Sequence, residues 1–414
     1  MGKELKVLMM GGARVGKSSA LAAIMDSFVH GEISRFLTAS DKTHLVEKNG
    51  KKQTSIEGKL QDVKTMIANN KGRTILVDSG KTSDQWDYKL DISIPGSYDN
   101  MSMLITDVNG EFFEDDNKYQ YKVLELVKDY DVFIVAIDTP FMMESRNREL
   151  VNRVINDKYN CISSIHRFLT SIDDQNGEDA KLVIFAPIKC EKWAQENKLD
   201  LVSACVREDY KTSLAALERF ESIQIEIIPI QTIGSVVFEE HREAYIYTQM
   251  SQSPYEKMQV SKCALLSDDK IRLGNGSEIN PKSGQIDLDS DAVLICGTDM
   301  TRPNSWFKVQ SSEYKPHNCE QLAFHILEFM LSKVIDVKVR KEEAENPFKV
   351  VLRIVIKLID KIFLINLWEK LKYVFGSIPI IKMDSIIKKM NAMYMIKRSG
   401  EGILILKKCS FRKF

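Results

Sequence analysis

The sequence has few cysteines, and their arrangement excludes two classes of protein. Seven occur in 414 residues, at positions 161, 190, 205, 263, 296, 319 and 409, and no two form a C-x-x-C pair. Disulfide-scaffold domains are cysteine-dense, and structural zinc sites need closely spaced ligands. We therefore expect reduced thiols in a cytoplasmic protein, with neither a disulfide framework nor a zinc site.

Long apolar runs are also missing. A transmembrane helix needs about 18–20 apolar residues. The nearest candidate, 350–367, is interrupted by Arg353, Lys357, Asp360 and Lys361. A strand-like segment begins within a few residues of Met1, so no signal peptide is expected. The sequence therefore predicts neither a transmembrane segment nor secretion.

Net charge is absent as well, because 58 Lys and Arg balance 58 Asp and Glu. The charges are unevenly spread: 331–414 holds 19 basic and 8 acidic residues, whereas 1–330 holds 39 and 50. A basic C-terminal part on an acidic body indicates docking within the chain or an anionic partner. No aromatic residues are interleaved with the basic ones, so nucleic acid is not the expected partner.

One short stretch carries the strongest functional signal. Residues 11–18 are GGARVGKS and match G-x-x-x-x-G-K-[ST], the phosphate-binding P-loop. The apolar run 6–10 predicts a buried strand before it, and 19–25 predicts a helix after it. Backbone N–H groups and a helix N-terminus would then converge on an anion. A nucleotide is the expected ligand, and a chance match in a strand–turn–helix unit is the alternative.

The residue types of this loop suit the task. Glycine at 11 and 16 lets the backbone turn and approach phosphate without a Cβ. Lys17 would reach the β- and γ-phosphates, and the Ser18 hydroxyl would ligate Mg2+. Arg14 is either a built-in charge stabiliser or a solvent-facing side chain. The predicted phosphate-binding residues are Gly11, Ala13, Arg14, Val15, Gly16, Lys17, Ser18 and Ser19.

A second motif, Asp-x-x-Gly, follows two predicted strands. Alternating apolar and polar residues over 86–94 predict an antiparallel edge strand, and 101–106 predicts the next strand. In P-loop NTPases an Asp at a strand end holds Mg2+, which is the position of Asp107. Gly110 would offer its backbone N–H to the γ-phosphate. The alternative is a strand that ends in a type I turn, where Asp and Gly are also favoured.

Strands and helices alternate through the first part of the chain. A continuous apolar run predicts a buried parallel strand over 131–138, and further strands are predicted over 180–187, which is also expected to be buried, and 223–230. Apolar spacing predicts helices over 56–67, 147–172 and 202–220, and a loop is expected over 69–84. The predicted fold is α/β, a P-loop NTPase with a mostly parallel sheet, one antiparallel edge strand and helices on both faces.

In this order, the motifs resemble those of a Ras-like GTPase domain of the translation-factor-related (TRAFAC) class. The segments 187–193, PIKCEKW, and 314–321, YKPHNCEQ, look like a divergent bacterial branch found in multi-gene conflict and defence systems. The resemblance covers 4–235 and 314–335. It implies a GTP-binding molecular switch with Mg2+ and GTP or GDP as cofactors.

The resemblance also implies how the base is recognised. Lys189 would pack its stem on the guanine ring, and Glu191 would accept hydrogen bonds from guanine N1 and N2, donors that adenine lacks. Thr232 and Ile233 would offer backbone N–H groups to guanine O6. The usual motif is Asn-Lys-x-Asp, whereas this chain has Ile188 and Glu191. A solvated charge pair at a strand end is the alternative.

Further roles follow from the same resemblance. Thr82, or Thr74 as the alternative, would be the switch threonine that ligates Mg2+ beside the γ-phosphate. Glu111 stands where Ras-like hydrolases often have a water-orienting Gln, and its charge next to triphosphate predicts slow or partner-activated hydrolysis. The predicted catalytic residues are Lys17, Thr82, Gly110 and Glu111. The predicted metal ligands are Ser18, Thr82 and Asp107.

The rest of the chain departs from this alternation. The expected parts are a Ras-like G domain over 1–236, an insertion of small strands and loops over 237–313, a closing helix over 314–336 and a basic helical C-terminal region over 346–414. Apolar runs at 292–296 and 306–309 predict strands in the insertion. His325, on the closing helix, is expected to be a satisfied or exposed helix residue and not a metal ligand.

Two amphipathic helices, 348–375 and 385–396, and a final strand over 402–406 are predicted in the C-terminal region. The helices form either a hairpin packed on the G domain or a membrane-surface or partner-binding element. An unidentified protein partner would bind the insertion and these helices. Two other functions stay open: a P-loop kinase, which would leave Lys189 and Glu191 without a purpose, and a nucleotide-binding scaffold without hydrolysis, suggested by Glu111.

Overall fold

The structure, a computed structural model, divides into two compact units. The first comprises 1–60, 80–232 and 316–414, and the second comprises 61–79 and 233–315. The residues that the structure describes are 4–48, 51–76, 85–94, 100–113, 124–125, 129–144, 156–157, 159–172, 180–242, 246–249, 264–266, 270–272, 278–279, 292–295, 304–345, 384–392 and 401–409.

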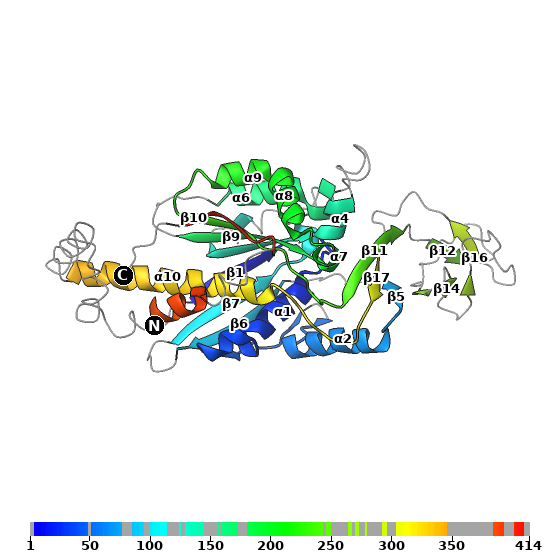
Figure 1. The fold of residues 1–414 in the computed structure, drawn as a ribbon, viewed down its shortest axis with the longest axis horizontal. Helices are drawn as coiled ribbons and strands as arrows, with labels where there is room; N and C mark the ends of the chain where they lie inside the picture. The colour runs from blue at the N-terminus through cyan, green and yellow to red at the C-terminus, as the bar shows by residue number, and fades with distance from the viewer. Residues whose placement is uncertain are drawn as a thin grey trace. The chain divides into compact units, whose positions relative to one another are not determined.

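An 8-stranded sheet in the order β18-β10-β9-β8-β1-β7-β6-β2 forms the centre of the first unit (Figure 1). Its strands are β1 Glu4–Met10, β2 Thr38–Asp41, β6 Trp86–Ser93, β7 Asn100–Asp107, β8 Val132–Asp138, β9 Lys181–Ile188, β10 Ile223–Ile227 and β18 Leu404–Lys407. Strands β7, β1, β8, β9 and β10 are parallel to one another. Every residue of β8 and β10 is buried, which explains the uninterrupted apolar pattern of β8, whereas β10 also buries Gln224 and Glu226. The mostly parallel α/β sheet is therefore confirmed.

The antiparallel strands differ from the predicted single edge strand over 86–94. Strand β6 does pair antiparallel with β7, but its other side pairs with β2, with Ala39 opposite Ile92. At the opposite edge, β18 pairs antiparallel with β10. The alternation along β6 reflects its one fully buried face, not an open edge. Strand β2 is the four-residue segment TASD, which is too short and polar to give a strand pattern.

Helices cover both faces of this sheet. The helices of the structure include α1 Lys17–Val29, α2 Ile56–Asn69, α4 Thr139–Glu144, α6 Ile162–Thr170, α7 Glu191–Gln195, α8 Leu199–Asp209, α9 Lys211–Leu217 and α10 Cys319–Glu345, with the short 3-10 helices η1 Glu32–Arg35 and η2 Gly110–Phe113. Helix α1 packs against α10, and α6 packs against α9. Figure 1 shows α6, α8 and α9 on one side of the sheet and α1 with α10 on the other.

Three helix predictions need correction. The predicted helix 202–220 divides at Tyr210, which leaves helical geometry while its ring packs 5.2 Å from that of Phe185. Within 147–172, residues 156–157, 159–160 and 162–170 are helical, and Cys161, with φ +52°, interrupts the helix before α6; residues 145–155 and 158 lie outside the described residues. Helix α10 continues to Glu345, beyond the predicted end of the closing helix.

Two ion pairs fasten α10 to the sheet. Lys333 lies 2.5 Å from Asp131, at the start of β8. His325 lies 2.7 Å from Glu226 on β10, and both side chains have no exposed surface. Of the two alternatives predicted for His325, the structure therefore shows a buried, ion-paired helix residue and not an exposed one. Helix α10 thereby presents its first turn near the end of α1, with which it packs.

The C-terminal part agrees with the sequence in two places. Residues 384–392 are helical and overlap the predicted helix 385–396, and Asn391 donates to Glu328 on α10 at 3.0 Å. The predicted final strand is β18. The predicted helix 348–375 lies outside the described residues. Among the helices that the structure describes, none has the length and apolar character needed to cross a membrane.

The second unit is built from small antiparallel sheets. One contains β11 Val236–Arg242, β17 Asn304–Val309 and β5 Thr74–Leu76, in the order β11-β17-β5. The others pair β12 Ile246–Gln249 with β16 Ala292–Ile295, and β13 Ala264–Leu266 with β14 Lys270–Arg272 and β15 Glu278–Ile279.

The strands expected at 292–296 and 306–309 are confirmed. The loop expected over 69–84 is wrong at β5, whose three residues are too few to give a pattern. The predicted domain boundaries remain a prediction.

Candidate functional site

The loop between β1 and α1 follows a path that requires glycine. Gly11 and Gly16 have φ of +139° and +111°. A Cβ on Gly11 would lie 2.6 Å from the carbonyl oxygen of Ala136, and one on Gly12 would lie 2.3 Å from that of Tyr159. Gly16 is the N-cap of α1 and supplies no side-chain cap. The first-turn N–H groups and the dipole of α1 therefore favour an anion in this loop.

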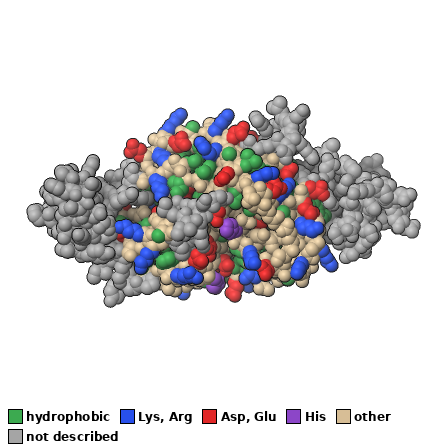
Figure 2. All heavy atoms as spheres, in the orientation of Figure 1, with side chains coloured by type: hydrophobic (Ala, Val, Ile, Leu, Met, Phe, Trp, Pro, Cys, Tyr) green, Lys and Arg blue, Asp and Glu red, His purple; other side chains and the backbone are tan. Residues whose placement is uncertain are grey.

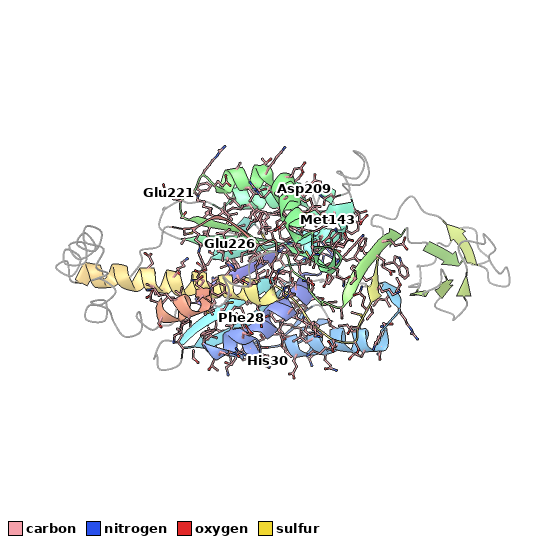
Figure 3. The ribbon with its side chains drawn as sticks, viewed as in Figure 1. Phe28, His30, Met143, Asp209, Glu221 and Glu226 are labelled. Carbon is pink, nitrogen blue, oxygen red and sulfur yellow. The ribbon has the colours of Figure 1, made fainter. Side chains whose placement is uncertain are left out.

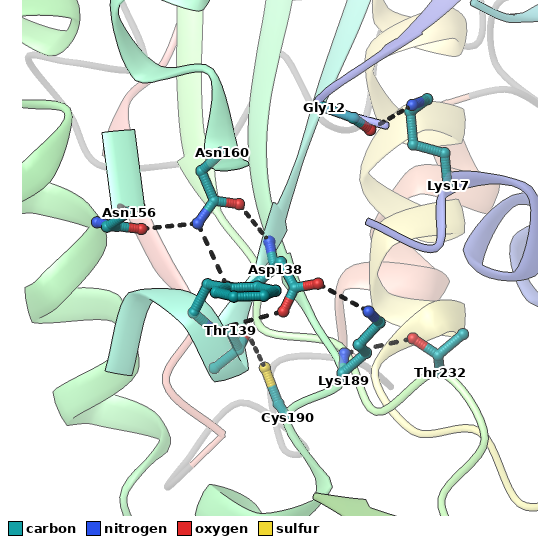
Figure 4. A network of polar contacts seen from close by, with 10 residues as sticks. Gly12, Lys17, Asp138, Thr139, Asn156, Asn160, Lys189, Cys190 and Thr232 are labelled. Carbon is teal, nitrogen blue, oxygen red and sulfur yellow. Dashed lines mark hydrogen bonds and ion pairs between the residues drawn. The ribbon is translucent and has the colours of Figure 1, made fainter. Parts of the chain in front are cut away.

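Lys17 is a buried cation at the start of α1. Its side chain is 5% exposed, and its Nζ donates to the carbonyl oxygen of Gly12 at 2.8 Å (Figure 4) and to that of Gly11 at 2.9 Å. The ammonium group is thus held over the loop itself. A bound phosphate would compete for these hydrogen bonds with a charged acceptor, which is the stronger partner.

Ser18 and Asp107 meet although they lie on different elements. The Ser18 hydroxyl donates to Asp107 Oδ2 at 2.5 Å, so the start of α1 is joined to the end of β7. Asp107 is fully buried, and its other oxygen, Oδ1, has no hydrogen-bond partner. An unpartnered buried carboxylate oxygen is costly unless a ligand completes it.

This pair suits a small divalent cation. Mg2+ prefers oxygen ligands and commonly takes one or two protein oxygens, with water and phosphate oxygens completing its octahedron. Ser18 and Asp107 offer one hydroxyl and one free carboxylate oxygen. Among the described residues, no cluster of three or more His, Cys, Asp or Glu side chains could hold a metal by itself. Phosphate and water would therefore supply the remaining coordination.

A lysine and a tyrosine that the sequence did not single out accompany Asp107. Lys59, on α2, donates to the hydroxyl of Tyr88, on β6, at 2.6 Å. Burial lowers the pKa of Lys59, and the charge of Asp107 acts in the opposite direction. Burial and then the charge of Asp107 raise the pKa of Tyr88. The alternation along β6 marked Tyr88 as inward-facing, but nothing in the sequence linked Lys59 to it.

The Asp-x-x-Gly motif brings η2 against the loop. A Cβ on Gly110 would lie 2.3 Å from the backbone nitrogen of Ala13, so only glycine allows this approach. Glu111 follows on η2 and is partly exposed, and its backbone N–H donates to Asn109 Oδ1 at 3.0 Å. The two motifs found in the sequence are therefore adjacent in space.

Lys189 reaches the loop from the end of β9. Its backbone adopts the left-handed region with φ +61°, and its Nζ donates to Asp138 Oδ2 at 2.7 Å. A Cβ on Gly16 would lie 3.3 Å from Lys189 Cε, which places the lysine stem beside the loop. The backbone N–H of Lys189 also donates to the Thr232 hydroxyl at 3.4 Å (Figure 4). Lys189 is therefore not the solvated surface charge of the alternative interpretation.

The other predicted base-recognition residues lie in different surroundings. Glu191 opens α7 and is 2% exposed, and Thr232 is 4% exposed. Glu191 is thus not a solvent-facing charge either. Ile233 begins the second unit, where its carbonyl oxygen accepts from the Lys315 N–H at 3.1 Å. Its proposed contact with the base remains a prediction.

The remaining predicted residues are less informative. Val15 is buried, Ser19 lies in the first turn of α1, and Arg14 is exposed with φ +59°, as its solvent-facing alternative requires. Thr82 lies outside the described residues. Its alternative, Thr74, is on β5 in the second unit and donates to Glu239 at 2.9 Å.

A polar network behind Lys189 was missed by the sequence. Asp138, the last residue of β8, is fully buried, and its backbone N–H donates to Asn160 Oδ1 at 2.7 Å (Figure 4). Asn160 in turn donates to Asn156 at 2.8 Å. Beside them, burial raises the pKa of the Cys190 thiol to about 12, so that thiol is unreactive. The position of Asp138 at the carboxyl end of a buried strand was the only available signal.

Comparisons with known proteins add little to this geometry. No family model and no curated protein matches the chain. Solved structures do match it. Among 46 matching chains is the S. cerevisiae Ski7 GTPase-like domain bound to GTP, with a TM-score of 0.27 and 14% identity. The match covers 55% of this chain, which spans 42% of that one. A likeness at this level assigns no function.

The residues around the loop between β1 and α1 combine three chemical features. The N-terminus of α1 and Lys17 favour a phosphate, the Ser18–Asp107 pair offers oxygens to a cation, and Gly110 closes against the loop. Lys189 and the buried Glu191 follow β9, the second parallel strand along from β1. Ligands of open parallel sheets bind at the carboxyl ends of the strands, where β1, β8 and β9 deliver these residues.

Proposed function

We propose that the chain binds GTP with Mg2+ at the loop between β1 and α1 and acts as a molecular switch with slow or partner-activated GTP hydrolysis. The observation that carries the proposal is the pairing of Ser18 with Asp107 at 2.5 Å, with Asp107 Oδ1 buried and unpartnered. A hydroxyl in the first turn of a helix that follows a glycine-containing loop, with a strand-end carboxylate beside it, provides the protein ligands that a Mg2+–triphosphate requires.

The phosphate-binding residues would act through position and charge. Lys17 would exchange the carbonyl oxygens of Gly11 and Gly12 for phosphate oxygens. The first-turn N–H groups of α1 would hold the phosphates in line with the helix dipole. When bound, Mg2+ would neutralise charge that develops on the phosphate oxygens. Lys59, buried near Asp107, would add a positive field on the same side.

Base selection would rest on Glu191. Its buried carboxylate would accept two hydrogen bonds from guanine N1 and N2, a pair of donors that adenine lacks. Lys189 would cover the ring with a stem that Asp138 already orients through its 2.7 Å ion pair. Thr232 and Ile233 would complete the base pocket. Glu191 replaces the usual Asp with a longer side chain, and its burial at the start of α7 supports a fixed orientation.

Switching would rest on η2. The backbone of Gly110 packs directly on Ala13, so a γ-phosphate at the loop and η2 share a boundary. Occupation of that boundary would bias η2 between two positions, and Thr82 would order with it. Glu111 would orient or deprotonate the attacking water. Its charge beside the phosphates is the reason to expect slow turnover.

The resemblance to the conflict-system branch suggests a multi-gene defence or signalling complex as the setting. A partner would bind the second unit or the C-terminal helices. A scaffold that binds nucleotide without hydrolysis is the remaining candidate that an observation favours, because Glu111 is not the usual glutamine. Single-turnover phosphate release distinguishes the two, since appreciable intrinsic turnover excludes the scaffold.

The site itself is tested by replacing Lys17 with alanine. We expect Lys17→Ala to weaken binding of a fluorescent GTP analogue by at least about 100-fold, because a charge-assisted hydrogen bond to phosphate contributes roughly 1.5–3 kcal/mol and Lys17 makes more than one. Lys198→Ala, at an exposed lysine before α8, is the matched control. Retained affinity in Lys17→Ala would place the nucleotide elsewhere.

A further inference from the structure

A second polar pocket lies in the first unit, away from the loop between β1 and α1. It measures about 300 Å³ and is lined by Asp26, Ser27, His30, Gly31, Pro316, His317, Asn318, Glu320, Gln321 and Glu401. These residues come from the end of α1, the start of α10 and the segment before β18. The length of α1 separates His30 from Lys17 by about 20 Å, at 1.5 Å per residue.

Several of the side chains that line this pocket have a buried polar atom without a partner. Gln321 is 3% exposed, and neither its Oε1 nor its Nε2 is hydrogen-bonded. Asn318 is 4% exposed, and its Oδ1 is unpartnered while its Nδ2 donates to the carbonyl oxygen of Pro229 at 2.9 Å. Glu401 Oε2 is buried without a partner as well. Each such atom costs about 1–3 kcal/mol unless a ligand or water satisfies it.

The side chains that line the pocket carry a net negative charge. Its lining includes three carboxylates, Asp26, Glu320 and Glu401, and no Lys or Arg. His30 lies 2.9 Å from Asp26, and His317 lies 3.1 Å from Glu401. The lining remains negative even with both imidazoles protonated. Carboxylates and histidines lie close together near the middle of the face in Figure 2, and His30 is labelled below α1 in Figure 3.

The helix ends point to the same ligand class. The C-terminus of α1, which favours a cation, closes the pocket at Ser27, His30 and Gly31. The N-terminus of α10 favours an anion, but Glu320 occupies its first turn and accepts from the Glu32 N–H at 3.2 Å. A Cβ on Gly31 would lie 2.4 Å from the carbonyl oxygen of Ser27, so glycine is required at this wall.

We propose that this pocket binds a small cationic ligand through a guanidinium or ammonium group. The unpartnered atoms comprise three acceptors, on Asn318, Gln321 and Glu401, and one donor, Gln321 Nε2. A guanidinium presents five donors in a planar fork and has no acceptor, which matches the acceptor-rich lining. The volume corresponds to a small ligand or to one basic side chain of a larger partner.

The experiment titrates the full-length chain with agmatine, which carries a guanidinium and an ammonium group. An N-acetylated, C-amidated Gly-Arg-Gly peptide represents a basic side chain, and 1,4-butanediol is the neutral control. We expect agmatine or the peptide to bind with about 1:1 stoichiometry by calorimetry and to raise the melting temperature. Whichever binds tighter identifies a free amine or a protein side chain as the source, and butanediol should have no effect.

Two variants test whether the ligand binds in this pocket. Glu401→Gln removes one charge, and Gln321→Leu removes the unpartnered polar atoms at similar volume. Each should weaken binding by about tenfold or more, the equivalent of one hydrogen bond to a charged group. Gln321→Leu should also leave the unliganded protein as stable as the parent or more stable, because it removes an unsatisfied buried amide. Glu196→Gln and Gln195→Leu, at the exposed end of α7, are the matched controls.

Two results would overturn the proposal. One is the absence of binding by both agmatine and the peptide at about 1 mM, the weakest affinity that these contacts allow. The other is unchanged binding in Glu401→Gln and Gln321→Leu together. If Gln321→Leu fails to fold, Glu401→Gln decides alone, because its side chain is 18% exposed and its removal leaves no cavity.

Discussion

The Ser18 hydroxyl lies 2.5 Å from the Asp107 carboxylate although 89 residues separate them in the chain. This contact joins the first turn of α1 to the last residue of β7. It is possible because β1 and β7 are parallel neighbours, so their carboxyl ends lie at the same edge of the sheet, with Met9 opposite Asp107. The separate sequence motifs thereby become one site.

Asp107→Asn tests whether this pair serves a cation. The substitution keeps the shape and the hydrogen bond from Ser18 but removes the negative charge. We expect the gain in GTP affinity on adding Mg2+ to fall by about tenfold or more, while affinity measured in EDTA changes little. Asp200→Asn, at an exposed position on α8, is the control. An unchanged Mg2+ effect in Asp107→Asn would show that the cation binds elsewhere.

Gly110→Ala tests the close approach of η2 to the loop. The new Cβ would lie 2.3 Å from the backbone nitrogen of Ala13, where no flexible side chain can move aside. We expect a loss of about 1–3 kcal/mol in unfolding free energy from overpacking, with weaker binding of Mg2+–GTP. Denaturant unfolding and nucleotide titration measure both.

The control for this variant is Gly58→Ala on α2. There a Cβ would meet only the side-chain atoms of Ser55 and Thr54, at 3.1 and 3.2 Å. Alanine also has the higher helix propensity, so stability should stay level or rise. Equal effects of the two substitutions would contradict the close approach of Gly110.

The buried pair of Glu226 and His325 predicts how stability depends on pH. Burial alone would raise the pKa of Glu226, but the charge of His325 and the hydrogen bond from Gln224 outweigh it and hold the pKa below its ordinary value of 4.5. A lowered folded-state pKa gives stability that is present above about pH 4.5 and is lost as the pH falls through the folded-state pKa.

Glu226→Gln should remove this dependence. Breaking one side of a buried ion pair costs about 3–5 kcal/mol at pH 7, and the loss of stability below about pH 4.5 should become shallower. Glu221→Gln, an exposed glutamate just before β10 (Figure 3), is the control. A Glu226→Gln variant with the parent pH profile would contradict the coupling.

Much of the central sheet could be predicted from the sequence. Strands β8 and β9 are nearly continuous apolar runs because they are buried on both faces, and β1 and β10 are apolar at most of their positions. Strands β2 and β5 were missed because three or four residues cannot establish a period. The break at Tyr210, whose ring packs against Phe185, was missed because the apolar spacing continues across it.

The residues of the candidate site were likewise only partly predictable from the sequence. Gly11, Gly16, Lys17 and Ser18 occupy a local motif, so their neighbourhood followed from spacing alone. Lys59, Tyr88 and Asp138 did not, because their partners lie on other elements. The Lys189–Asp138 pair, for example, spans 51 residues. Such residues come together only in the tertiary fold, and no local pattern in the sequence marks them as partners.

Competition between GTP and ATP tests the central claim most directly. A fluorescent GTP analogue is bound to the parent chain and to Glu191→Gln, and each is titrated with GTP and with ATP. We predict that GTP displaces the analogue from the parent at least about 100-fold more effectively than ATP, since adenine lacks the two donors that guanine offers to this carboxylate, and that Glu191→Gln loses most of this preference. Equal displacement of the analogue from the parent by ATP and GTP would contradict the assignment of a guanine-specific site.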